Sequence, residues 1–251
     1  MPRFPVALQP YTIRDQLQAD FLGALSKVAE IGYTALEIGP PPAEISLEDM
    51  KAHLQRLNVQ VMGCHASVEQ LQTNPENIIS FLHEMGGKYV TLSYRFESKE
   101  EVLARAADFN AIGRHLKDNG VQFLYHNHDW EFVKFDGEYA LDLLLAHTDP
   151  DLVQMELDVY WVAKGGEDPA TYLRKLQDRC PVLHMKDMEP GAEQFFAEVG
   201  EGILDMPGIL QVAEEIGVKW LVVEQDLSRR NPFESIQISL ENLKKMEAVL
   251  V

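Results

Sequence analysis

The sequence predicts an α/β protein built as a single (β/α)₈ TIM barrel. Short apolar runs alternate with longer amphipathic segments along the chain, which is the pattern of parallel βαβ units. There are eight such runs, and 251 residues is an ordinary length for one barrel of this type. No linker or low-complexity segment interrupts the alternation. We therefore expect residues 1–251 to form one domain.

The predicted strands are rich in β-branched and aromatic residues, as expected for strands buried between helices. They are Pro5–Gln9, Ala35–Gly39, Val59–Ser67, Tyr89–Tyr94, Val121–His128, Leu152–Tyr160, Pro181–Asp187 and Trp220–Gln225. Proline after Asn or Asp marks three helix starts, and glycine before several strands fits left-handed helix caps. The helices are predicted near 17–30, 46–57, 75–85, 98–118, 138–147, 169–178, 207–216 and 232–249.

Composition limits the partners and the compartment. The net charge of −18, from 40 acidic and 22 basic residues, repels phosphate backbones and anionic lipids, so we expect neither nucleic acid nor a membrane as partner. Cys64 and Cys180 lack metal-like spacing, and the first residues lack the apolar stretch of a signal peptide. These features favour a cytoplasmic protein with a small-molecule partner, and a homo-oligomer stays an open alternative.

Polar residues stand at the ends of most predicted strands. In parallel barrels the substrate binds at the carboxyl ends of the strands. A buried carboxylate or imidazole there costs several kcal/mol unless it is paired or bound to a metal. The strand-end residues are Glu37, His65, Tyr94, Arg95, His126, Asn127, His128, Asp158, His184, Lys186, Asp187 and Glu224.

Four of these residues end four consecutive strands and are the predicted metal ligands: His126, Asp158, His184 and Glu224. Two imidazoles and two carboxylates suit Mn²⁺, Co²⁺, Zn²⁺ or Fe²⁺, and suit Mg²⁺ less well. The alternative is a hydrogen-bonded network without a metal.

Five motifs occur in order along the chain, namely Tyr125-His126-Asn127-His128, Glu156 to Trp161, His184-Met185-Lys186-Asp187, Val199-Gly200-Glu201-Gly202 and Val222 to Asp226. This series resembles the xylose-isomerase-like superfamily of sugar isomerases and epimerases, especially its branch near myo-inosose dehydratase. The resemblance implies one divalent metal, often manganese, held by Glu, Asp, His and Glu after strands five to eight. Asp158, His184 and Glu224 match three of these positions. His126 stands where relatives commonly have glutamate, so we expect Mn²⁺ first and keep the other metals open.

The expected reaction is metal-dependent isomerisation, epimerisation or elimination on a keto-sugar or keto-inositol, by proton abstraction next to a metal-bound carbonyl. Glu224 is the expected base, and His128 or Lys186 could assist a departing hydroxyl. The resemblance implies that ketose 3-epimerases use two glutamates, whereas only Glu224 matches here. One-base isomerisation or elimination therefore competes with two-base epimerisation.

Other residues are expected to contact the substrate, each with a structural alternative. Trp161 could form a wall against a sugar ring or pack in the core, and Glu201 lies in a glycine loop that either closes over substrate or forms a plain turn. The full set is Glu37, His65, Tyr94, Trp161 and Glu201. Two other functions stay open, a barrel that binds a sugar or metal without turnover, and an abasic-site endonuclease, which the acidic charge disfavours.

Overall fold

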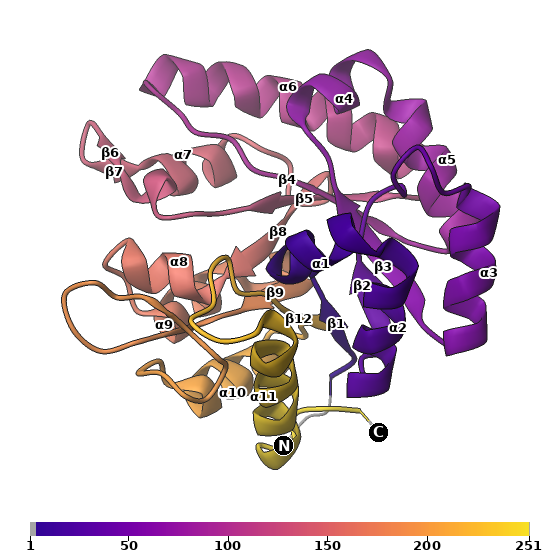
Figure 1. The fold of residues 1–251 in the computed structure, drawn as a ribbon. Helices are drawn as coiled ribbons and strands as arrows, with labels where there is room; N and C mark the ends of the chain where they lie inside the picture. Colours follow the sequence, from indigo (N-terminus) through magenta and orange to yellow (C-terminus); the bar gives the residue numbers. More distant parts are fainter. Residues whose placement is uncertain (1–3, 251) are drawn as a thin grey trace.

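Eight parallel strands close into a barrel in the computed structural model, which describes residues 4–250 (Figure 1). Around the barrel the strand order is β1-β12-β9-β8-β5-β4-β3-β2, which confirms the predicted TIM barrel. Residues 1–3 and 251 of the predicted domain lie outside the described residues. The barrel strands are β1 (Val6–Leu8), β2 (Ala35–Glu37), β3 (Gln60–His65), β4 (Tyr89–Leu92), β5 (Gln122–His126), β8 (Val153–Asp158), β9 (Val182–Met185) and β12 (Trp220–Val223).

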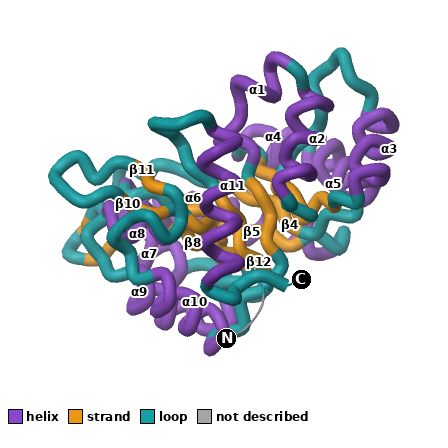
Figure 2. Tube along the Cα trace, turned by 60° about the horizontal axis from the view of Figure 1, so that its bottom comes forward, coloured by secondary structure: helices purple, strands orange, loops and turns teal. Residues whose placement is uncertain are grey.

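Helices surround the strands, which lie at the centre of the tube view (Figure 2). Among residues 4–250, no helix is both long and apolar enough to cross a membrane. The α-helices are α1 (Arg14–Ala19), α2 (Phe21–Ile31), α3 (Leu47–Leu57), α4 (Val68–Thr73), α5 (Pro75–Met85), α6 (Lys99–Asp118), α7 (Ala140–Ala146), α8 (Val159–Lys164), α9 (Pro169–Leu176), α10 (Met206–Glu215) and α11 (Pro232–Lys245). Short 3₁₀ helices are η1 (Pro10–Ile13), η2 (Trp130–Phe132) and η3 (Gln177–Arg179).

The structure corrects two predicted helices. The helix expected at 17–30 is divided into α1 and α2, because Asp20 adopts an extended backbone and its carboxylate caps the N–H of Gly23. The helix expected at 138–147 begins at Ala140, after a two-residue strand. Two small antiparallel hairpins, β6 (Lys134–Phe135) with β7 (Glu138–Tyr139) and β10 (Asp187–Met188) with β11 (Phe196–Ala197), are too short to show a sequence period.

The barrel interior is layered. The layer nearer the amino ends of the strands, called the lower layer, is apolar and consists of Ala7, Ala35, Met62, Leu124, Val182 and Val222. Side chains two residues apart on a strand point to the same face, so the next inward layer is fixed by the strands. Two residues beyond Ala35, Leu124, Val182 and Val222 come four polar side chains, and the barrel therefore carries a charged layer directly above an apolar one. These polar residues are Glu37, His126, His184 and Glu224.

A buried carboxyl group organises the loop after β5. Glu131 is fully buried, and its two oxygens lie 2.8 Å from the Tyr125 hydroxyl and 2.8 Å from the backbone nitrogen of His128. Burial raises the pKa of Glu131 to about 8, although the contact with Tyr125 opposes the shift. The protonated acid can donate to the Tyr125 oxygen while it accepts from His128, so the neutral form fits this loop.

Replacing Glu131 by Gln should reproduce that neutral form. The pKa of Glu131 is above its ordinary 4.5, so the wild type should lose stability as the pH rises from about 4.5 to 8. Glu131→Gln should match the wild type near pH 5 and exceed it near pH 9 by at least about 1 kcal/mol in unfolding free energy. Urea unfolding of both proteins at the two pH values measures the difference. An equal difference at both pH values would contradict a neutral Glu131.

Candidate active site

A cavity of about 320 Å³ lies at the carboxyl ends of the strands. Gln9 and Tyr11 line it from the segment after β1, and neither was predicted from the sequence as a site residue. Five predicted site residues also line it, His65, His126, His128, Lys186 and Glu224. The complete lining is Gln9, Tyr11, His65, Ser93, His126, His128, Lys186, Glu224 and Asp226.

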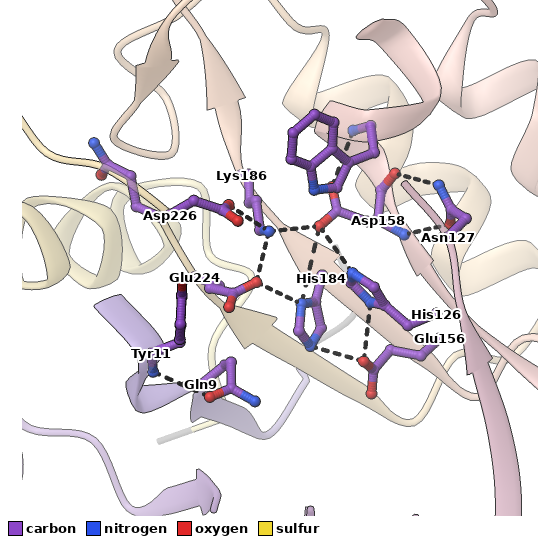
Figure 3. Close-up of polar contacts among 12 residues, drawn as sticks. Gln9, Tyr11, His126, Asn127, Glu156, Asp158, His184, Lys186, Glu224 and Asp226 are labelled. Carbon is purple, nitrogen blue, oxygen red and sulfur yellow. Dashed lines mark hydrogen bonds and ion pairs between the residues drawn. The ribbon is translucent and has the colours of Figure 1, made fainter. Parts of the chain in front are cut away.

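The four predicted ligands point toward one another (Figure 3), and two of them, His126 and Glu224, line the cavity. The Nδ1 atom of His184 lies 3.1 Å from Glu224 Oε2 and 3.9 Å from Asp158 Oδ2. The Nε2 atom of His126 lies 3.8 Å from the same Asp158 oxygen. The structure therefore brings together the side chains that the sequence placed at four separate strand ends.

The two carboxylate oxygens of Asp158 have different partners. Its Oδ1 accepts the backbone N–H of Trp161 at 3.1 Å and so caps α8. Its Oδ2 is buried and forms an ion pair with the Lys186 ammonium at 3.0 Å, and no other donor of residues 4–250 lies within hydrogen-bond distance of it. One oxygen is thus fixed by the helix and the other is left facing His126 and His184.

Lys186 follows β9 and points to the same side as His184, two residues earlier. Its ammonium is 1% exposed and lies 2.6 Å from Glu224 and 2.7 Å from Asp226 in addition to Asp158. Burial lowers the pKa of Lys186, but these carboxylates outweigh it and hold the pKa well above its ordinary value. The side chain is therefore positively charged in the resting protein and lies on the cavity wall.

A second pair of carboxylates lies below the histidine rings. Glu156 was missed by the sequence reasoning, which examined only the last polar residue of this strand. It precedes Asp158 by two positions and so points into the barrel as well. Glu156 Oε1 lies 3.1 Å from His126 Nδ1, 3.0 Å from His65 Nε2 and 3.0 Å from His184 Nε2. Its Oε2 accepts the Thr91 hydroxyl at 3.0 Å.

Glu37 is the other member of this pair. It is fully buried, and its Oε2 lies 2.8 Å from His184 Nε2 and 3.3 Å from His65 Nε2. Glu37 does not line the cavity, in contrast to the predicted substrate contact, because the carboxylate points beneath the rings. Its position fits a group that holds His184 and His65.

Opposite charges keep this pair of carboxylates ionised. Burial raises the pKa of Glu156, but His184 and His65 outweigh it and lower the pKa to about 2. The pKa of Glu37 is well below its ordinary value because the same imidazoles outweigh its burial. Burial lowers the pKa of His65, yet Glu37 and Glu156 raise it to about 10, and His184 is shifted in the same direction.

The pKa shifts differ for the groups nearer the cavity, which lie above the Glu37 and Glu156 pair. Burial raises the pKa of Asp158 to about 6, with Lys186 opposing the shift. Burial and the charge of Lys186 lower the pKa of His128 to about 3, and burial also lowers that of His126 well below its ordinary value. Burial raises the pKa of Glu224, but Lys186 and His184 outweigh it and hold the carboxylate ionised.

These residues fit a divalent cation. Donor atoms of Asp158, His184 and Glu224 lie within 4.8 Å of one another, and His126 Nε2 lies 3.8 Å from Asp158 Oδ2. The His rings turn their other nitrogens toward carboxylates, an arrangement common behind metal-ligating imidazoles. A bound cation would share Asp158 and Glu224 with Lys186, which keeps Asp226 as a further partner. The histidines would have to be neutral when they bind it.

An aromatic wall borders the cavity. The His128 ring stacks on Trp130, with centroids 3.8 Å apart, and lies 5.3 Å from Trp161. Trp161 packs against Tyr160 and Phe196, and the Lys186 ammonium lies 5.7 Å from its ring. Trp161 therefore contributes to packing and supports this wall, while His128 itself faces the cavity.

Two predicted substrate contacts point away from the cavity. The Tyr94 hydroxyl donates to Glu101 at 2.6 Å on α6, and Glu201 accepts from Asn242 of α11 at 3.0 Å. Neither side chain lines the cavity. The loops after their strands turn outward, which the strand-end rule alone could not predict.

Asp187 holds the glycine loop after β9. Its buried carboxylate accepts four backbone N–H groups, those of Met188, Gly200, Gly202 and Leu204, at 2.8–3.1 Å. A Cβ atom on Gly202 would lie 2.2 Å from Asp187 Oδ1, so the loop needs glycine there. Asp187 is therefore a structural anchor beside Lys186.

Comparisons with known proteins agree with this fold. An inosose dehydratase of Clostridium beijerinckii is 27% identical over 259 residues, covering 85% of both chains. A solved sugar phosphate isomerase/epimerase of Parabacteroides distasonis is 26% identical, with a TM-score of 0.83 over 95% of this chain and 93% of that one. The solved IOLI protein with a binding zinc atom shares the fold at 17% identity, with a TM-score of 0.76 over 97% and 98% of the two chains. The family model described as "Xylose isomerase-like TIM barrel" matches residues 25–246, and the chain belongs to that family.

Proposed function

We propose that the protein is a divalent-metal-dependent lyase that removes water from an unphosphorylated keto-inositol or a related keto-sugar. One observation carries the proposal: Glu224 and Lys186 lie 2.6 Å apart on one wall of the cavity, next to the convergent ligands. The other lining residues include no second glutamate that could act from the opposite face. The relatives named inosose dehydratase support this substrate class. Isomerisation or epimerisation of the same class is the alternative.

His126, Asp158, His184 and Glu224 would hold the metal. Two nitrogen and two oxygen donors favour Mn²⁺, Co²⁺, Zn²⁺ or Fe²⁺ over Mg²⁺. When bound, such an ion supplies Lewis acidity that makes a C–H group next to a carbonyl easier to deprotonate. Asp158 keeps its cap on α8 through Oδ1, so its other oxygen is held in place by the helix.

The protein side chains would move the proton. Glu224 is an ionised carboxylate at the cavity and would accept the proton from carbon. Lys186 would donate a proton to the departing hydroxyl, which leaves as water, and would recover its proton from Glu224 across their 2.6 Å contact. The Nδ1 atom of His128 has no hydrogen-bond partner within residues 4–250 and would bind a substrate oxygen.

Charge favours an unphosphorylated substrate. Glu224 and Asp226 both line the cavity, and the ammonium of Lys186 is already shared among three carboxylates. Arg14 lies nearby, but its guanidinium donates to the backbone oxygens of Tyr11 and Asp226. The carboxylates of the lining would repel a phosphate dianion, and no cationic side chain of the lining is free to pair with it.

The acidic surface supports the further proposal that nucleic acid is not a partner. A cytoplasmic location, assembly into a homo-oligomer and a single domain over residues 1–251 stay predictions from the sequence.

Asp158→Asn should weaken Mn²⁺ or Co²⁺ binding by more than about 100-fold, because the change removes a charged ligand. Asparagine can still cap α8, so the fold should persist. Asp168→Asn is the matched control, since Asp168 caps α9 through the N–H of Thr171 at 2.7 Å, away from the ligands. Titration calorimetry gives both affinities. Equal affinities in the two variants would contradict the ligand assignment.

Glu224→Gln should lower the rate of dehydration of a keto-inositol by about 10²- to 10⁴-fold, because it removes the base. The measurement is product formation, with deuterium incorporation in heavy water, for wild type and variant; Asp168→Asn serves again as control. A wild type that binds metal but neither exchanges nor dehydrates the substrate would support the binding-protein alternative. Rapid epimerisation without water loss would instead favour an epimerase.

A further inference from the structure

We propose that Glu156 is a positioning residue of the metal site, which fixes the nitrogen that His126 presents to the ligand space. The inference rests on the proposed function, because it concerns the same site. Glu156 is fully buried and does not line the cavity, so a substrate in the cavity does not reach it. Its effect would pass through the histidine rings.

The His126 ring lies between two carboxylates. Its Nδ1 is 3.1 Å from Glu156 Oε1, and its Nε2 is 3.8 Å from Asp158 Oδ2. A neutral imidazole carries one proton, which a carboxylate beside Nδ1 holds on that nitrogen. The lone pair of Nε2 is then free on the side of Asp158. Without the carboxylate charge, the two tautomers of His126 would be closer in energy.

His184 is oriented in the opposite sense. Its Nε2 faces Glu37 at 2.8 Å and Glu156 at 3.0 Å, whereas its Nδ1 faces Glu224 at 3.1 Å. The two rings therefore turn different nitrogens toward the ligand space. The two carboxylates below the rings account for both orientations. Glu156 contacts His126, and Glu156 and Glu37 both contact His184.

The backbone and one hydroxyl group fix Glu156 itself. His126 and Glu156 are direct partners in the pairing of β5 with β8, and Glu156 also pairs with Val182 of β9. The buried Thr91 hydroxyl lies 3.0 Å from Glu156 Oε2 and 3.4 Å from Glu37 Oε1. The carboxylate is thus held from below, and Oε1 is directed at the rings.

Glu156 could alternatively be a ligand, since donor atoms of His65, His126, Glu156 and His184 also lie within 4.8 Å of one another. The occupied oxygens argue against this. Oε1 of Glu156 already has three ring nitrogens within 3.1 Å and Oε2 has Thr91. Asp158 Oδ2, in contrast, has one partner, the Lys186 ammonium at 3.0 Å, and the rings of His126 and His184 lie 3.8 and 3.9 Å from it.

The test is Glu156→Gln, which keeps the size of the side chain and removes its charge. Co²⁺ affinity should fall by about 10- to 100-fold, with one ion still bound per chain and a changed visible absorption spectrum of the bound Co²⁺. Glu198→Gln is the matched control, because Glu198 is also a buried glutamate but bonds Ser235, away from the ligands. Asp158→Asn provides the reference for loss of a ligand.

Two outcomes would overturn the proposal. Affinity equal to that of Glu198→Gln would mean that Glu156 does not position the rings, and loss of binding as complete as in Asp158→Asn would make Glu156 a ligand. Thr91→Val, a milder change that releases Oε2, should shift affinity in the same direction by a smaller factor.

A readout that needs no metal separates this inference from the proposed function. Nitrogen chemical shifts of His126 in ¹⁵N NMR should show the proton on Nδ1 in the wild type and a changed tautomer ratio in Glu156→Gln. An unchanged ratio contradicts the positioning role, even if the wild type binds no metal. Failure of the wild type to bind Co²⁺ contradicts only the proposed site.

Discussion

Charge compensation inside the barrel is the constraint on which the rest of the site depends. Glu37, Glu156 and Asp158 are fully buried, and isolated carboxylates in such a place would neutralise rather than stay charged. Imidazoles stand beside the lower pair, while Lys186 stands beside Asp158. Removing one partner would leave an unpaired buried charge, which generally costs more than the pair contributes. The layer is therefore a coupled unit.

This unit has two levels, one that orients the histidine rings and one that can bind a cation. In the lower level both oxygens of Glu156 have partners, so it can orient its neighbours but has little room for a ligand. In the upper level Asp158 Oδ2 has only the Lys186 ammonium as a close partner among the described residues, and the cavity opens beside Glu224. A cation site needs ligands that are held in orientation from below and carboxylate oxygens that can be reached from above.

Much of this could be predicted from the sequence, because strand alternation is local. Apolar runs located the eight strands, and polar residues at their ends located His126, Asp158, His184 and Glu224. Glu156 shares the inward face of Asp158 and was within reach of the same rule. The outward course of the loops carrying Tyr94 and Glu201 depends on contacts with α6 and α11, which no local pattern encodes.

Anomalous X-ray scattering from crystals soaked in Mn²⁺ tests the central claim most directly, since it locates the ion without reference to activity. The account predicts a single peak bounded by His126 Nε2, Asp158 Oδ2, His184 Nδ1 and Glu224. A peak among Glu37, His65 and Glu156, or no peak at Mn²⁺ concentrations that saturate related enzymes, would contradict it.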